Sequence, residues 1–215
     1  VGYQWRIRNL RYREKALDRL VAERTAELQL TNARLRTLNQ REAERSADFQ
    51  QQAMTDALTG LPNRRAFENR LGLLLQDRVP LVLGLLDIDH FKRINDQYSH
   101  GAGDEVLTAL GQHLRQHLSS NGLQRRGDPF VARWGGEEFA ILWPHADLTM
   151  ARDMAEKLRL SVAERVWPRE EGSFRLTISV GLAERRGEES ADAFLRRADA
   201  QLYAAKHAGR NRIEA

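Results

Sequence analysis

The segment of this sequence best suited to chemistry is Arg133-Trp134-Gly135-Gly136-Glu137-Glu138-Phe139, in which two adjacent carboxylates follow a pair of glycines. Apolar, β-prone residues flank it on both sides. Glycine adopts the positive φ angles of a tight hairpin turn without a steric cost. The segment therefore predicts a β-hairpin with strands over 129–134 and 137–143, joined by a Gly135-Gly136 loop that presents Glu137 and Glu138.

A second acidic group ends an apolar run. Residues 79–86 are apolar on both faces, as in a central buried strand, and they are followed by Asp87-Ile88-Asp89. Residues two apart on a strand point to the same side, so both aspartates would face one site if the strand continues through Asp89. An acidic strand end can also be only a helix cap or a surface ion pair. The additional presence of Glu137 and Glu138 favours a carboxylate cluster.

The chain contains no cysteine, so any metal must be held by oxygen or imidazole ligands, and a reducing compartment is consistent with the composition. Carboxylates suit a hard cation such as Mg²⁺, with Mn²⁺ as the alternative, and such an ion shares oxygen atoms with substrate phosphates. The pattern therefore indicates phosphoryl or nucleotidyl transfer. The sequence contains no Gly-Lys-Ser or Gly-Lys-Thr loop and no histidine in a hydrolase motif, which argues against P-loop enzymes and Ser–His–Asp hydrolases.

Cations for those phosphates are expected at the end of the last predicted helix. Lys206 and Arg210 are four residues apart and lie on the same side of the helix end. Arginine can bind a phosphate through two hydrogen bonds, and lysine acts as a point charge. The alternative is a basic pair that only complements the helix dipole.

The elements that would position these groups alternate along the chain. Gly60 and Pro62 end a preceding helix, and Asn63 can cap a new helix that runs to about Gln76. Three further helices are expected over 103–118, 149–166 and 191–207, and a further strand over 174–181. Strands separated by helices predict an α/β (α+β) sandwich with one main sheet.

Residues 1–52 form a different region, rich in helix-forming Arg, Glu, Ala, Leu and Gln. One heptad position holds Ile7, Glu14, Val21, Leu28, Leu35, Glu42 and Phe49, and its partner holds Tyr3, Leu10, Leu17, Arg24, Thr31, Leu38 and Arg45. This pattern predicts a long helix that pairs with a second copy of itself, with polar core positions that make the pairing marginal. The alternative is a rigid spacer without a signalling role. The expected domains are 1–52 and 53–215.

Several classes of protein are not supported. The net charge of +4 is small for a chain with 34 basic residues, and no basic cluster is interleaved with aromatics, so we expect no nucleic-acid partner. No apolar run approaches the roughly 18 residues that cross a bilayer, and no signal peptide is evident. The sequence therefore predicts a soluble chain. Tyr3 and Trp5, each near an arginine, are typical of a membrane-interface flank and indicate a transmembrane segment upstream in the natural protein.

Taken together, the motifs of residues 55–215 resemble those of the GGDEF family of diguanylate cyclases. The motifs that carry the resemblance are, in chain order, Asp56-x-Leu58-Thr59-Gly60-Leu61-x-Asn63-Arg64, Asp87-Ile88-Asp89-x-Phe91-Lys92-x-Ile94-Asn95-Asp96, Gly101-x-Gly103-Asp104, Arg133-Trp134-Gly135-Gly136-Glu137-Glu138-Phe139, Ser179-x-Gly181 and Ala205-Lys206-x-x-Gly209-Arg210-Asn211. The resemblance implies a fold like the palm of nucleotidyl cyclases and polymerases. It also implies the Mg²⁺-dependent condensation of two GTP molecules into cyclic di-GMP, with loss of two pyrophosphates.

The resemblance further assigns expected roles to individual residues. Asp87, the carbonyl of Ile88 and Glu137 would bind the metal, with Glu138 as a second acidic ligand, and Glu137 would also act as the catalytic base. Asn95 and Asp104 would bind the guanine, and His100, which lies between these two in the sequence, would also contact the substrate. Phe91 would form a wall of the pocket. The phosphates would be bound by Lys92, Lys206 and Arg210, and the backbone at Gly135 and Gly136 would approach the substrate closely.

The two-fold symmetry of that product implies a homodimer in which two domains face each other. A coil that ends just before Asp56 would set how they face and would transmit an upstream signal. The expected location is the cytoplasm, with the full-length protein anchored in the inner membrane.

One departure from the family pattern concerns an inhibitory product site, Arg-x-x-Asp, found in many relatives. The position expected for its aspartate holds Pro129, and Arg125-Arg126-Gly127-Asp128 spells the motif one residue too early. Proline also restricts the conformation of the preceding Asp128. We therefore expect weak or absent product inhibition through Arg125, Arg126 and Asp128.

Two other classes of function remain as alternatives. The domain could be a degenerate module that binds GTP or cyclic di-GMP without turnover, although the intact acidic residues argue against it. It could also be a coiled-coil scaffold whose globular part only supports interactions.

Overall fold

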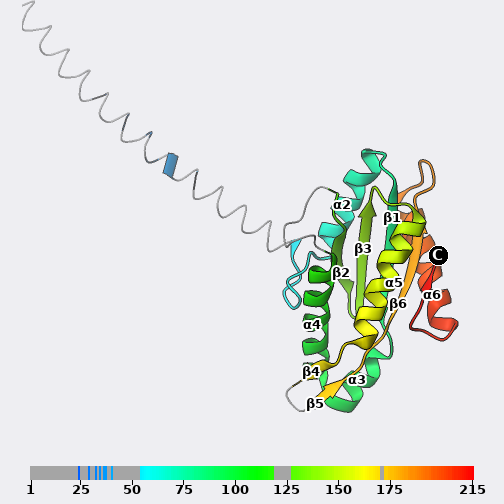
Figure 1. Ribbon diagram of the computed structural model, residues 1–215. Helices are drawn as coiled ribbons and strands as arrows, with labels where there is room; N and C mark the ends of the chain where they lie inside the picture. Colours follow the sequence, from blue (N-terminus) through cyan, green and yellow to red (C-terminus); the bar gives the residue numbers. More distant parts are fainter. Residues whose placement is uncertain are drawn as a thin grey trace, which may run out of the picture. The chain divides into compact units, whose positions relative to one another are not determined.

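The computed structural model (Figure 1) describes residues 54–118, 127–169 and 172–215, together with seven residues of the N-terminal segment. These seven, Arg24, Gln29, Asn32, Arg34, Arg36, Thr37 and Gln40, are all helical and exposed. The chain divides into two compact units, residues 1–51 and 52–215. The apolar heptad positions of the expected coiled coil lie outside the described residues, so that prediction is not tested here. None of the described helices is long and apolar enough to cross a membrane.

A five-stranded sheet forms the centre of the second unit, in the order β2-β3-β1-β6-β7. Its strands are β1 (Leu81–Ile88), β2 (Phe130–Gly135), β3 (Glu138–Pro144), β6 (Ile178–Glu184) and β7 (Ile213–Glu214). The central strand β1 runs antiparallel to both β3 and β6, whereas β6 and β7 pair in parallel. The chain order strand, helix, strand, strand, helix, strand is that of a ferredoxin-like unit. The predicted α/β sandwich with one main sheet is thus confirmed.

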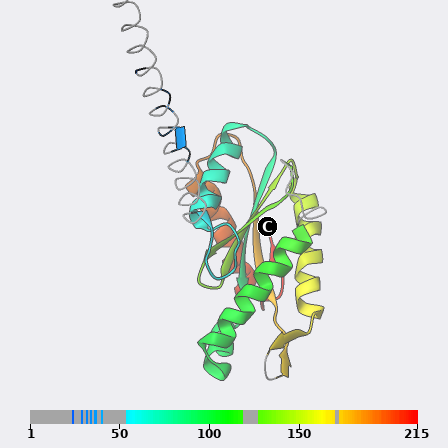
Figure 2. The same ribbon diagram turned by 90° about the vertical axis from the view of Figure 1, so that its left-hand side faces the viewer.

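Two pairs of helices cover the two faces of this sheet (Figure 2). Helices α4 (His100–Leu118, green) and α5 (Leu148–Glu164, yellow) pack on one face, and α2 (Arg64–Gln76, cyan) and α6 (Ala191–His207, orange to red) pack on the other. Along β1 the side chains alternate between the two cores, with Leu81, Leu83 and Leu85 on the α2/α6 side and Val82, Leu86 and Ile88 on the α4/α5 side. The strand is apolar throughout because both of its faces are buried.

Local sequence signals fix several helix boundaries. The side chain of Asn63 accepts a hydrogen bond from the backbone N–H of Ala66 at 3.1 Å, which caps α2 as expected. Ser190 caps α6 in the same way. Helix α6 spans the predicted range, and α5 ends two residues before the predicted boundary because Trp167 begins a new strand.

The prediction of a single strand over 174–181 is wrong. The range 174–181 contains the end of β5 (Gly172–Phe174) and the start of β6, and β5 pairs with β4 (Trp167–Arg169) in a separate two-stranded sheet. Between them the backbone carbonyl of Thr177 accepts a hydrogen bond from the N–H of Asp89 at 2.9 Å. A short helix α3 (Phe91–Tyr98), which the sequence did not predict, follows β1.

The hairpin exists, but its loop is displaced by one residue. Strand β2 ends at Gly135, which pairs with Glu138, so the loop is Gly136-Glu137. Gly136 has a positive φ of 52°, whereas the φ angle of Gly135 is not positive. The cause is a bulge at Trp134, whose ring packs edge-on against Phe67 at 5.5 Å. The displacement puts Glu137 at the tip of the turn and Glu138 at the start of β3.

Candidate active site

The two acidic segments meet at one end of the sheet. Asp87, near the end of β1, lies directly opposite Glu138 on β3. Residues paired across an antiparallel ladder share a face of the sheet, so both carboxylates lie on the side covered by α2 and α6. The turn residue Glu137 precedes Glu138 and lies at the same end. The structure therefore brings Asp87 together with Glu137 and Glu138, as the sequence predicted.

Asp87 is the electrostatic centre of this cluster. It is buried, with 7% of its surface exposed, and the ammonium of Lys206 on α6 lies 2.7 Å from its Oδ2 atom. Burial raises the pKa of Asp87 to about 6, the ion pair with Lys206 opposes this rise, and the negative charges of Glu137 and Glu138 add to it. The mutual repulsion of three carboxylates is the situation that a bound cation relieves.

Asp89 does not belong to the cluster, so the expectation that both aspartates face one site is wrong. Strand β1 ends at Ile88, and the alternation of side chains ends with it. The carboxylate of Asp89 accepts hydrogen bonds from Thr177 Oγ1 and Ser179 Oγ, each at 2.7 Å, and from the backbone N–H of Asn211 at 2.9 Å. Both of its oxygens are thus engaged within the protein.

The oxygen atoms available at the cluster are of the kind that binds Mg²⁺. Across the ranges 54–118, 127–169 and 172–215, no group of three or more histidine or acidic side chains is close enough together to enclose a metal. Mg²⁺, however, is usually bound by one or two carboxylates, with water and substrate phosphates supplying the remaining ligands. Asp87 and one glutamate of the turn, with the carbonyl of Ile88 at the end of β1, are a set of that kind.

A second group of predicted residues gathers where α3 meets α4. Phe91 is the first residue of α3 and is buried, and Lys92 beside it is exposed. His100 and Asp104 are exposed in the first turns of α4. The side chain of Asn95, on α3, faces Gly103 of α4, and its Oδ1 atom is buried without a hydrogen-bond partner among the described residues. A buried acceptor without a partner is costly, and a ligand donor would remove that cost.

Gly103 makes the position of Asn95 possible. A β-carbon at residue 103 would collide with Asn95 Oδ1 and would lie 3.1 Å from Phe91 Cζ. The family-like spacing of Gly103 and Asp104 therefore has a steric basis, because the glycine leaves room for the amide and the aspartate extends into solvent one residue later.

Arg210 lies beyond the end of α6, in a loop whose backbone is left-handed. Its φ angle is 62° and its side chain is exposed. Lys206, one helical turn earlier, is held against Asp87. The two predicted phosphate-binding cations thus come from one helix end, and one of them already contacts the acidic cluster.

Sequence reasoning missed a residue that supports the turn. The guanidinium of Arg133 donates from Nη1 to both carboxylate oxygens of Asp56 at 3.1 Å, and from Nη2 and Nε to the carbonyl of Gly136 at 2.9 and 3.1 Å. Burial acts to raise the pKa of Asp56, but hydrogen bonds from Thr59 and Arg133 outweigh it and hold the pKa below its ordinary value. The signal was present: an arginine next to the turn, and an aspartate in a turn-forming Asp-x-Leu-Thr segment.

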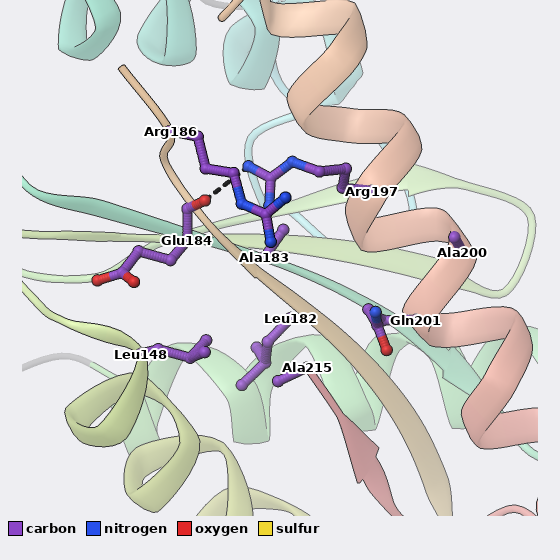
Figure 3. Close-up of a pocket in the computed structure, with 9 residues that line it drawn as sticks. All are labelled: Leu148, Leu182, Ala183, Glu184, Arg186, Arg197, Ala200, Gln201 and Ala215. Atoms are coloured by element: carbon purple, nitrogen blue, oxygen red, sulfur yellow. Dashed lines mark hydrogen bonds between the residues drawn. The ribbon is translucent and has the colours of Figure 1, made fainter.

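A cleft of about 270 Å³ lies elsewhere, at the other end of β6 (Figure 3). Leu182, Ala183 and Glu184 of β6 line it, with residues of α6 on one side. Arg197, which points across it, donates to the backbone carbonyl of Glu184 at 2.6 Å and is paired with Glu189. None of the predicted site residues lines this cleft, so it is distinct from the acidic cluster.

The expected inhibitory product site is described only in part. Arg125 and Arg126 lie outside the described residues, and Asp128 precedes Pro129 just before β2 begins.

Comparisons with known proteins agree with this geometry. The family model described as "Diguanylate cyclase, GGDEF domain" matches residues 53–212. Diguanylate cyclase DgcP of Pseudomonas aeruginosa is 43% identical over 171 residues, which are 78% of this chain and 24% of that protein. Diguanylate cyclase VdcA of Vibrio cholerae is 39% identical over 175 residues, 79% of this chain and 49% of that protein. The chain thus spans about a quarter to a half of the length of these relatives.

A solved structure covers more of the chain. The coiled coil and GGDEF domain of DgcB from Caulobacter crescentus, in complex with c-di-GMP, superimposes with a TM-score of 0.79 at 32% identity. The match covers 87% of this chain and 98% of that one. Diguanylate cyclase SiaD of Pseudomonas aeruginosa, solved with its activator SiaC, gives a TM-score of 0.70 at 30% identity and covers 99% of this chain and 79% of that one.

Proposed function

Because the chain belongs to the GGDEF domain family of diguanylate cyclases, we propose that it condenses two molecules of GTP into cyclic di-GMP and releases two pyrophosphates. The observation that carries this proposal is the arrangement at Asp87: a buried carboxylate faces the acidic turn on one side and is paired with Lys206 on the other. Metal ligands and a phosphate-binding cation thus share one sheet end.

Asp87, the carbonyl of Ile88 and Glu137 would hold Mg²⁺ or Mn²⁺, with Glu138 as a further acidic ligand. When bound, the ion assists deprotonation of the attacking hydroxyl and neutralises charge on the leaving pyrophosphate. Glu137, at the tip of the turn, accepts the proton of the 3′-hydroxyl. A bond forms between that oxygen and the α-phosphorus of the second GTP, and the bond from the α-phosphorus to the bridging oxygen breaks. A second step of the same kind closes the ring: the other 3′-hydroxyl attacks the remaining α-phosphorus, and the second pyrophosphate leaves.

The remaining residues bind and orient the nucleotide. Lys206 and Arg210 contact the phosphates, with Lys92 as a further cation and with the backbone at Gly135 and Gly136 approaching closely. Asn95 Oδ1 and the carboxylate of Asp104 accept hydrogen bonds from the N1–H and amino group of guanine, a pair of donors that adenine lacks. Phe91 walls this pocket and His100 lies beside it. The buried Oδ1 atom of Asn95 supports this assignment, because a guanine donor would supply its hydrogen bond.

Each domain holds one GTP, so turnover requires a homodimer in which two sites face each other across a two-fold axis. We place the dimer contact in the coiled coil of residues 1–52, whose register would set the relative orientation of the domains. An upstream sensor and membrane segment would supply the signal. Inserting four residues into the coil should change turnover while the dimer persists in solution; unchanged turnover in a dimeric variant would contradict the signalling role.

The direct test is incubation of the purified chain with GTP and Mg²⁺ and analysis of the products by chromatography. Cyclic di-GMP should form, EDTA should stop its formation, and Mg²⁺ or Mn²⁺ should restore it. Glu137→Gln should abolish product and leave the dimer intact. GTP binding without turnover would favour a degenerate binding module instead, and neither binding nor turnover would favour a scaffold.

A further inference from the structure

The loop that carries Arg210 has an unusual backbone. Gly209, Arg210 and Asn211 have consecutive positive φ angles of 114°, 62° and 47°. Glycine adopts such angles freely, and asparagine does so more readily than most residues, but arginine rarely does. A strained backbone of this kind persists only where neighbouring groups hold it in place.

Two hydrogen bonds to Asn211 hold the loop. Its backbone N–H donates to Asp89 Oδ2 at 2.9 Å, and its side-chain Oδ1 accepts from Arg159 Nη1 at 2.6 Å. Arg159, on α5, is itself fixed by two hydrogen bonds to Glu156 at 2.5 and 2.9 Å. The N–H of Arg210 also donates back to the carbonyl of Ala205 at 3.0 Å. The backbone of the loop is thus tied down, while the side chain of Arg210 is left exposed.

Asp89 connects this loop to the metal-binding end of the sheet. It is 6% exposed, and its two oxygens also accept hydrogen bonds from Thr177, just before β6, and from Ser179 in β6. Asp89 follows Asp87 by two residues, so the carboxylate proposed to bind metal and the anchor of the loop that carries Arg210 lie on one short stretch of chain. This stretch therefore links the proposed metal site to the loop.

We propose that Asp89 is a positioning residue for the reaction: by accepting the N–H of Asn211 it fixes the left-handed loop that presents Arg210 to the phosphates of GTP, and Arg159 supports the same loop through the Asn211 side chain. This inference rests on the proposed function for the identity of the substrate. It assigns to the second aspartate of Asp87-Ile88-Asp89 a role that involves neither metal nor substrate contact.

The kinetic test separates action through Arg210 from a general loss of structure. Asp89→Ala should raise KM for GTP about tenfold, as expected for the loss of a charged contact, with a smaller effect on kcat. Asp89→Asn should stay within about twofold of the wild type, because its carbonyl can accept the Asn211 N–H while its amide donates to the Ser179 hydroxyl. Arg210→Ala should raise KM as Asp89→Ala does, and the double variant should be no worse than either single one. Independent, multiplying effects would overturn the proposal.

Hydrogen exchange provides a readout that does not depend on turnover. The Asn211 amide should be protected in the wild type and in Asp89→Asn, and it should exchange faster in Asp89→Ala while amides of β1 stay protected. Unchanged protection of Asn211 in Asp89→Ala would overturn the proposal, even if the wild type made no cyclic di-GMP and the proposed function itself had failed.

A milder variant covers the case in which Asp89→Ala does not fold. Asn211→Gly keeps the left-handed backbone and its N–H but removes the contact with Arg159. It should raise KM for GTP less than Arg210→Ala does, and Arg159→Met should reproduce its effect. A wild-type KM in both folded variants would show that the loop needs no support from α5 and would contradict that part of the proposal.

Discussion

Lys206 Nζ lies 2.7 Å from Asp87 Oδ2, so an ion pair joins α6 to β1 at the point where metal and phosphates are proposed to meet. The positive charge of this lysine offsets part of the repulsion among Asp87, Glu137 and Glu138. When nucleotide and metal bind, both groups of this pair would acquire new partners. The same contact thus joins the two residues that are proposed to bind the metal and the phosphates.

Lys206→Met should have opposite effects on metal and nucleotide. Without GTP, Mn²⁺ should bind more tightly, because a positive charge next to Asp87 has been removed; with GTP, KM should rise about tenfold or more, because a charged contact with phosphate is lost. Titration calorimetry with Mn²⁺ alone and steady-state kinetics measure the two effects. Weaker Mn²⁺ binding by the variant would show instead that Lys206 organises the carboxylates.

The raised pKa of Asp87 predicts a specific pH dependence of stability. The folded protein holds this proton up to about pH 6, whereas an ordinary aspartate loses it near 3.8. Between these values the folded state binds more protons than the unfolded state, so the contribution of Asp87 to stability falls as the pH rises and is constant above about 6.

Asp87→Asn removes that contribution and leaves the other titrating groups in place. In EDTA, the stability of the variant relative to the wild type should therefore increase from pH 4 to pH 6 and then level off, as measured by urea unfolding. The half-buried His113, whose pKa burial lowers to about 4 with help from Arg165 and His117, gives a slope of opposite sign in both proteins and cancels in the comparison. A relative stability independent of pH would contradict the prediction.

Gly103→Ala should damage guanine recognition specifically. The added β-carbon would displace the Asn95 amide, so we expect KM for GTP to rise about tenfold, as for the loss of a buried hydrogen bond, and the preference for GTP over ITP to fall. Gly101→Ala is the matched control, since a β-carbon there would meet only Ser99 Oγ at 3.7 Å. Equal kinetics for the two alanine variants would refute a role of Gly103 in holding Asn95.

Arg133→Lys should loosen the acidic turn. Lysine keeps the charge but cannot contact both Asp56 and the carbonyl of Gly136 in the geometry of a guanidinium, so kcat should fall about tenfold while the protein remains folded. Asp56→Asn should act in the same direction and should not add to it. Arg78→Lys, in an exposed pair with Glu188, is the control and should have wild-type kinetics. Full activity of Arg133→Lys would exclude this support for the turn.

Product feedback is expected to be weak. Progress curves of the wild type should show little inhibition by added cyclic di-GMP, and Arg125→Ala and Arg126→Ala should leave them unchanged, because Pro129 occupies the position of the expected aspartate. Strong inhibition that depends on either arginine would show that the displaced motif binds the product.

Much of the domain was predictable from sequence, because its signals are local. The cap at Asn63, the apolar run of β1 and the bounds of α6 each depend on neighbouring residues, and the structure confirms them. The register of the hairpin was not predictable, since it depends on Trp134 packing against Phe67 from a distant helix.

The site shows the same division. The cluster of Asp87, Glu137 and Glu138 follows from strand ends and a turn, which sequence can indicate. That Asp89 turns away from Asp87 could not be predicted from local sequence. The position of Asp89 depends on hydrogen bonds to Thr177, Ser179 and Asn211, which only the folded chain brings within reach. Arg133 was missed for a related reason: its partner Asp56 is 77 residues away.

The link between Asp89 and Asn211 spans 122 residues of sequence, and this separation bears on how the domain is made. A chain emerging from the ribosome can pair β1 with β3 and form the acidic cluster well before Asn211 has left the exit tunnel. The loop of Gly209, Arg210 and Asn211 can close on Asp89 only after α6 and Asn211 have been synthesised. A nascent domain is therefore expected to gather its carboxylates early and to stay catalytically silent until α6 and the loop after it have been synthesised.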